Sequence, residues 1–141
     1  MLSLIYISCQ SVEPGDRSEV LDDIQVVSIA RNTQLDMTGL LITTSDHFMQ
    51  LLEGPASGVN AVMASILVDP RHHGVRIIRR SELDERCYPQ WRMARFDGER
   101  FGGAGVNALL AACHANDDPV ARAKLDRLIE TVAFATAPAR A

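Results

Sequence analysis

The sequence predicts an α+β domain in which two helices are inserted between short strands, and three patterns in the chain predict it. Residues 2–8 and 47–54 are short, mostly apolar runs between turn residues, which is typical of strands. Residues 16–32 and 55–68 repeat apolar side chains every three or four positions, the spacing of one helix face. Proline, glycine and aspartate separate these segments, so each is expected to end at a turn.

Composition limits the kinds of protein this can be. The 141 residues, 47% of them hydrophobic and 23% charged, suffice for one core with a small appendage. A net charge of -4 without a dense Lys/Arg stripe argues against nucleic acid as a partner. No basic signal-peptide start and no membrane-spanning apolar run is visible, so we expect a cytoplasmic protein without a membrane partner. The separated Cys9, Cys87 and Cys113 predict free thiols rather than disulfides or a zinc site.

The first helix carries two stripes with different chemistry. It follows the strand at residues 2–8 and a Glu-Pro-Gly break, and Asp16 is a suitable residue to begin it. The predicted core stripe consists of Val20, Ile24, Val27 and the stem of Arg31. The adjacent polar stripe consists of Gln25, Ser28 and Asn32. That polar stripe is either a solvated shoulder of the helix or the wall of a ligand site.

The middle of the chain predicts, in order, a hairpin of two strands, a second helix, a loop and two further strands. These elements are assigned to residues 38–44, 47–54, 55–68, 69–74, 75–78 and a segment within 88–96. The complete order of strand, helix, strand, strand, helix, strand, strand matches a ferredoxin-like layout with one extra strand. Both helices are then expected to cover one face of the sheet.

The last third of the chain predicts a helical extension. Residues 98–105 are rich in glycine and predict a linker, so we place a core domain at residues 1–97 and an extension at 98–141. Two short helices are expected at residues 107–114 and 119–134. Their apolar side chains are expected to cover the bare sheet face or a second subunit; they are Leu109, Leu110, Leu125, Leu128, Ile129 and Val132.

Gln50 is the unusual residue of the strand at 47–54. Because side chains alternate along a strand, Gln50 shares its face with Phe48 and Leu52. A buried carboxamide costs free energy unless its donors and acceptor find partners. Gln50 therefore requires either a structural partner or a polar ligand against that face.

Conventional enzyme or metal chemistry receives little support. Residues 103–108 match G-x-G-x-x-A, but no buried strand plainly precedes them, so we interpret them as part of the linker. His72 and His73 are adjacent on an extended backbone and should diverge, with no third ligand spaced to help. No Ser/His/Asp or Cys/His set supplies an obvious nucleophile. We therefore predict neither an enzyme nor a metal centre.

Five short motifs, in this order, resemble the BLUF family of flavin-binding blue-light sensors over residues 1–97. They are Ile5-Tyr6-Ile7-Ser8, Ala30-Arg31-Asn32 followed by Thr38-Gly39-Leu40-Leu41, Phe48-x-Gln50-x-Leu52-Glu53-Gly54, Asp69-Pro70-Arg71-His72 and Trp91-x-Met93. The ferredoxin-like layout of that family agrees with the order of elements deduced from the residues. Arg31 departs from the family, whose members often carry Asn or His there.

The resemblance implies a flavin between the first two helices, expected to be FAD with FMN or riboflavin as alternatives. Its N5/O4 edge would face Tyr6 and Gln50. The other implied binding residues are Ser28 and Arg31 in the wall, Asn32 at the pyrimidine edge, and Asp69, Arg71 and His72 near the ring carbonyl or ribityl chain. An arginine suits such an edge because its planar fork of donors stays charged.

The resemblance also implies a mechanism and an output. Light would drive an electron and a proton from Tyr6 through Gln50, leaving that amide with a changed orientation or tautomer, which Trp91 or Met93 on the last strand would sense. The signal is expected to reach an unidentified downstream protein, and a homodimer is expected. The alternative is a cofactor-free ferredoxin-like regulatory module, in which Tyr6 and Gln50 simply bond each other in a core. A flavin enzyme is less well supported, because no nicotinamide-binding unit is present.

Overall fold

A computed structural model describes residues 1–98, 104–116 and 118–136, and within them the backbone forms a five-stranded sheet. The strands are β1 (Leu2–Gln10), β2 (Thr38–Thr43), β3 (His47–Gly54), β4 (His72–Glu82) and β5 (Ala94–Asp97). Their order is β4-β1-β3-β2-β5, antiparallel except that β5 runs parallel to β2. This arrangement confirms the predicted ferredoxin-like sheet with one extra strand at its edge.

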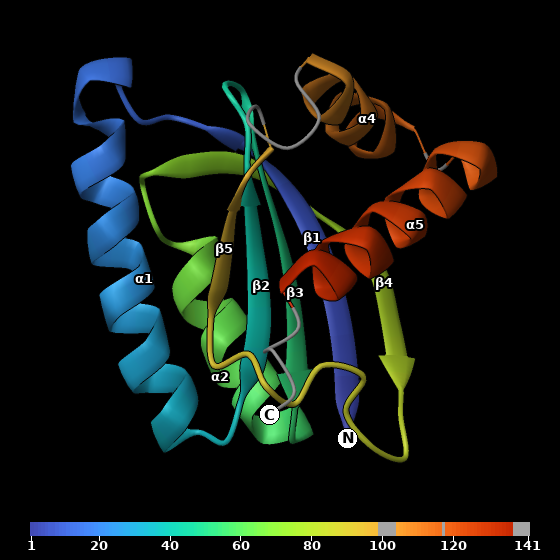
Figure 1. Cartoon of the computed structure of the whole chain (residues 1–141). Helices are drawn as coiled ribbons and strands as arrows, with labels where there is room; N and C mark the ends of the chain where they lie inside the picture. The colour runs from blue at the N-terminus through green and yellow to red at the C-terminus, as the bar shows by residue number, and fades with distance from the viewer. Residues whose placement is uncertain (99–103, 117, 137–141) are drawn as a thin grey trace.

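Helices cover both faces of the sheet (Figure 1). On one face lie α1 (Arg17–Gln34), which follows the 3-10 turn η1 (Pro14–Asp16), and α2 (Ala56–Leu67). On the other face lie α4 (Ala104–Ala115) and α5 (Pro119–Thr136). The expectation that the C-terminal helices dock on the face left bare by the first two is therefore confirmed.

The alternation of strand side chains produces two separate cores. Toward α1 and α2 the strands direct, among others, Leu4, Tyr6, Leu41, Phe48 and Leu52. Toward α4 and α5 they direct Ile5, Ile7, Leu40, Ile42, Met49 and Leu51, which meet the buried Leu110, Leu125, Ile129 and Val132. The sheet thus separates the core that contains Tyr6, under α1 and α2, from the core that the strands form with α4 and α5.

The predicted core stripe of α1 is wrong in part: Ile24 packs against the core that contains Tyr6, but Val27 does not. Val27 is 62% exposed, and the side chains that α1 buries are Leu21, Ser28 and Asn32. The polar stripe faces inward because the segment before β5 presents backbone carbonyls to it. Gln25 Nε2 donates to the Met93 carbonyl at 3.2 Å, and Asn32 Nδ2 donates to the Arg92 carbonyl at 2.6 Å. A solvated shoulder is therefore excluded for Ser28 and Asn32.

Two other element boundaries differ from expectation. β4 runs over residues 72–82 rather than 75–78, because its backbone pairs with β1 from Gln10 opposite His72 to Leu2 opposite Glu82. Backbone pairing does not require apolar side chains. The apolar pattern of the sequence therefore marks only residues 75–78 and not the polar ends of this strand. α4 begins at Ala104, so the predicted linker at 98–105 is wrong for its last two residues, and residues 99–103 lie outside the described chain.

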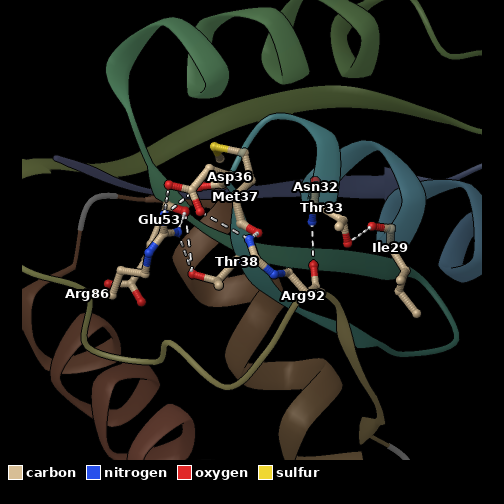
Figure 2. Close-up of polar contacts among 9 residues, drawn as sticks. All are labelled: Ile29, Asn32, Thr33, Asp36, Met37, Thr38, Glu53, Arg86 and Arg92. Atoms are coloured by element: carbon tan, nitrogen blue, oxygen red, sulfur yellow. Dashed lines mark hydrogen bonds and ion pairs between the residues drawn. The ribbon is translucent and has the colours of Figure 1, made fainter.

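Glu53 anchors the segment that leads to β5. It is 1% exposed, and its carboxylate accepts the backbone N–H groups of Cys87 at 3.0 Å and Tyr88 at 2.8 Å. Figure 2 shows the neighbouring Arg86 donating to the Glu53 carbonyl at 2.8 Å, and it also shows the contact between Asn32 and Arg92. A buried carboxylate at the end of β3 thus holds the chain that carries residues 91–93.

Glu53→Gln should lower the free energy of unfolding by about 1 to 3 kcal/mol, because one carboxylate acceptor becomes an N–H donor facing a backbone N–H. Urea denaturation followed by circular dichroism measures this change. Glu82→Gln is the matched control. Glu82 is exposed at the end of the edge strand β4, so a change within about 0.5 kcal/mol is expected. Equal losses in the two variants would contradict the anchoring role of Glu53.

Candidate functional site

Tyr6 and Gln50 form a hydrogen-bonded pair at the centre of the sheet. The register of β1 and β3 sets them directly opposite each other, and the two side chains are 3% and 5% exposed. The Tyr6 hydroxyl donates to Gln50 Oε1 at 2.6 Å, while Gln50 Nε2 donates to Met93 Sδ at 3.8 Å. Both ends of the buried amide are therefore engaged, one by a phenol and the other by a weakly accepting thioether.

A cavity of about 360 Å³ opens beside this pair, within the range of small-molecule sites. Its lining includes these predicted site residues: Tyr6, Ser28, Arg31, Gln50, Asp69, Arg71 and His72. Apolar walls come from Ile24 and Val27 of α1, Leu41 and Phe48 of the sheet, and Ile66 of α2. The cavity can accept a flat apolar body with polar edges.

Arg71 and Asp69 form an exposed ion pair in the lining. Arg71 Nε lies 2.9 Å from Asp69 Oδ1, and Arg71 Nη2 lies 2.5 Å from Oδ2. The hydrogen bond from Arg71 lowers the pKa of the Asp69 carboxyl below its usual value. The carboxylate holds the guanidinium in place, and its remaining N–H groups can serve an oxygen of a ligand.

His72 contributes its ring to the wall rather than a free nitrogen. Its Nε2 lies 2.7 Å from the Ile66 carbonyl, which can only accept, so Nε2 carries the proton and Ser8 Oγ donates to Nδ1 at 2.7 Å. The ring meets the rings of Tyr6 and Phe48 edge-on at centroid distances of 6.0 and 6.1 Å. His73 is exposed and bonds Ser11 instead, so the two histidines diverge as predicted.

Three buried polar atoms on α1 have no hydrogen-bond partner among the described residues: Arg17 Nε at the start of the helix, and Arg31 Nε and Asn32 Oδ1 in its last turn. Asn32 does not line the cavity as predicted, because its Nδ2 is turned to the Arg92 carbonyl. Arg31 does line it, and burial lowers the pKa of its guanidinium. An acceptor and a donor thus remain unsatisfied in the last turn of the helix that forms one wall, which is costly unless a ligand supplies partners.

Comparisons with known proteins agree with this geometry. A family model described as BLUF, sensors of blue-light using FAD, matches residues 1–94. The chain belongs to the BLUF family. The "Blue light- and temperature-regulated antirepressor BluF" of Escherichia coli strain K12 is 37% identical over 110 residues, or 72% of this chain and 24% of that protein. The chain therefore spans about a quarter of the length of that relative.

Solved structures support the same assignment. A dark state structure of the BLUF protein BlrB has a TM-score of 0.74 and 28% identity, covering 93% of this chain and 96% of that chain. A structure of Klebsiella pneumoniae BlrP1 with FMN and cyclic diGMP has a TM-score of 0.67 and 26% identity, covering 98% of this chain and 37% of that chain. BLUF domains are flavin-based light sensors, which confirms the prediction that this domain is a light sensor. None of the helices that the structure describes is long and apolar enough to span a membrane.

The last segment of the BLUF domain sends its two candidate signalling side chains to opposite faces. Met93 lies in the core that contains Tyr6, with its sulfur against Gln50. Trp91 lies in the core of α4 and α5, where its ring stacks on Tyr88 at a centroid distance of 4.9 Å. The sequence left open whether Trp91 or Met93 lies next to Gln50. In the structure the neighbour of Gln50 is Met93.

Several lining residues of the BLUF cavity were not predicted. They are Ile24, Val27, Leu41, Phe48, Ser65 and Ile66. Strand alternation could have identified Phe48, because it shares a face with Gln50. No sequence signal marks Ser65, whose place in the wall depends on how the end of α2 packs against the sheet.

The buried phenol of Tyr6 should make stability fall at alkaline pH. Burial raises the pKa of this group above its ordinary value of 10.0, so above that pH the unfolded chain loses a proton that the folded chain keeps. The free energy of unfolding then falls by up to about 1.4 kcal/mol per pH unit from this group. Tyr6→Phe should flatten that slope between about pH 10 and pH 12 in urea denaturation. An unchanged slope would mean that the Tyr6 phenol ionises alike in both states.

Proposed function

We propose that this chain senses blue light through a flavin held in the cavity of Tyr6 and Gln50, and that Gln50 passes the event to Met93. The observation that carries the proposal is a buried chain of two hydrogen bonds beside that cavity, from the Tyr6 hydroxyl to the Gln50 amide and from that amide to the Met93 sulfur. One of these hydrogen bonds is strong and the other is weak, so the amide can change its partners at modest cost. Membership of a family of flavin-based blue-light sensors supports the same function.

The residues of the cavity suit a flavin. Apolar side chains on α1, α2 and the sheet can enclose a flat ring. Asn32 lies outside the lining, and its unpaired Oδ1 would have to turn toward the cavity to accept an N–H from the pyrimidine edge. Arg31 and Arg71 are donors for ring carbonyls or phosphate. We propose FAD, in agreement with the family description, with FMN next because a BlrP1 structure contains it. The exposed Arg71 favours either phosphorylated flavin over riboflavin, because a guanidinium binds phosphate strongly.

Tyr6 is the proposed donor of both an electron and a proton. When bound, the flavin supplies absorption of blue light and, once excited, oxidising power. Burial raises the pKa of Tyr6, so its phenol keeps the proton in the dark over the physiological pH range. The short hydrogen bond to Gln50 Oε1 provides the direction in which this proton can move.

A rotated Gln50 amide would force a change at Met93. Rotation turns Oε1 toward the Met93 sulfur, and two acceptors then face each other where an N–H now donates at 3.8 Å. The thioether has no hydrogen to offer, so Met93 must repack. Met93 is therefore the proposed first receiver of the signal.

The proposed output passes through the backbone from Met93 to Trp91. The two side chains lie on opposite faces of the sheet, and Trp91 packs in the core shared with α4 and α5. A shift of Met93 can thus alter the packing of the C-terminal helices, whose described core residues lie on the opposite face of the sheet from the cavity. The receiver of that change is proposed to be a downstream protein or a second copy, and the homodimer stays a prediction.

An absorption spectrum before and after blue light tests this function. The purified protein should be yellow, and illumination should move its flavin bands reversibly to longer wavelength. Tyr6→Phe, which keeps the ring volume but removes the phenolic proton, should retain flavin and lose the shift.

Two outcomes would contradict the proposal. A colourless protein that also fails to bind added FAD or FMN would favour the cofactor-free regulatory module. A normal photocycle in Tyr6→Phe would remove Tyr6 from the mechanism while leaving the flavin site intact.

A further inference from the structure

A second group of chemically reactive side chains lies on the opposite face of the sheet from the cavity. Cys9 at the end of β1, His47 at the start of β3 and His114 in the last turn of α4 each offer one ligand atom, and these atoms lie within 4.8 Å of one another. By strand alternation, Cys9 shares the side of Ile5 and Ile7 that packs against α4. The cluster therefore sits where the light-sensing sheet meets the C-terminal helices.

Hydrogen bonds select the neutral tautomer of both imidazoles. His114 Nε2 lies 2.6 Å from the Gly74 carbonyl, which only accepts, so Nε2 carries a proton and, in the neutral ring, Nδ1 keeps a lone pair. His47 Nδ1 lies 3.2 Å from Asn107 Oδ1. The Asn107 amide is oriented by its Nδ2, which donates to Asp46 Oδ2 at 2.9 Å, so its oxygen faces His47. In the neutral form each ring thus donates one N–H to an oxygen and retains one nitrogen for a metal, as metal-ligating histidines usually do.

We propose that Cys9, His47 and His114 bind a divalent transition metal ion of the Zn²⁺ class, with water in the fourth position. Thiolate and imidazole are ligands that Zn²⁺ prefers, at about 2.3 Å for sulfur and about 2.0 Å for nitrogen. A tetrahedral ion holds such atoms roughly 3.5 Å apart, so atoms that now lie within 4.8 Å of one another must close by up to about 1.3 Å. The thiol of Cys9 gives up its proton to solvent as the sulfur–metal bond forms.

All three residues are half-buried, which leaves an approach for the ion and for the fourth ligand. The sequence alone does not predict this site, because Cys9, His47 and His114 are widely separated in the chain and follow no spacing pattern. The bound ion would join β1 and β3 to α4, three elements that otherwise meet through apolar contacts and the Asn107 hydrogen bonds. It would therefore fix α4 on the sheet independently of the flavin.

Metal titration of the full chain, kept reduced and first dialysed against chelator, tests the site. One Zn²⁺ per chain should bind and raise the melting temperature, since an ion that binds only the folded state stabilises it. Co²⁺ should give a thiolate charge-transfer band. Cys9→Ser should abolish that band, and Cys9→Ser, His47→Gln and His114→Gln should each weaken binding at least tenfold, as expected for lost metal contacts.

Matched controls separate this site from adventitious binding. Cys87→Ser and His73→Gln remove an exposed thiol and an exposed imidazole outside the cluster, and neither should change the affinity. Circular dichroism of each variant shows that the fold is intact. The proposal is overturned if no saturable binding is found, if Cys9→Ser binds like the unmodified chain, or if Cys87→Ser carries the loss.

Discussion

The buried amide of Gln50 is the constraint on which this structure depends. A carboxamide inside a sheet needs partners on both ends, and the fold supplies the Tyr6 hydroxyl on one side and the Met93 sulfur on the other. Bringing Met93 there requires the segment before β5 to be held against α1. Gln25 and Asn32 do this by donating to its carbonyls, while Glu53 fixes the chain just upstream. Much of the polar interior thus serves the position of one side chain.

The sheet gives the domain two faces, and the proposed communication between them passes through the segment that leads to β5. Tyr6 and Gln50 face the cavity, whereas the neighbouring Ile5 and Met49 face α4 and α5. Met93 and Trp91 repeat this division two residues apart in one segment. Cores are closely packed, so a repacked Met93 cannot be absorbed locally without moving the backbone that also carries Trp91. This geometry makes a sensor whose C-terminal helices need no contact with the cofactor.

Much of the fold and part of the site could be predicted from sequence because they depend on local patterns. Strand alternation grouped Gln50 with Phe48 and Leu52, the family resemblance set Tyr6 beside Gln50, and turn residues delimited the helices. The apolar stripe assigned to α1 failed at Val27, because Gln25 and Asn32 donate to carbonyls of a distant segment and so turn the polar side of the helix inward. The proximity of Cys9, His47 and His114 likewise depends on how α4 packs on the sheet, which no local pattern encodes.

Hydrogen exchange in the dark and under blue light tests most directly whether Gln50 signals through Met93 to the C-terminal helices. The account predicts that light changes the protection of α4 and α5, with a coupling of about 1 to 3 kcal/mol. In Met93→Leu, which keeps the volume but removes the sulfur acceptor, the flavin bands should still shift while this change shrinks. Identical protection in dark and light, with a normal spectral shift in the unmodified chain, would contradict the account.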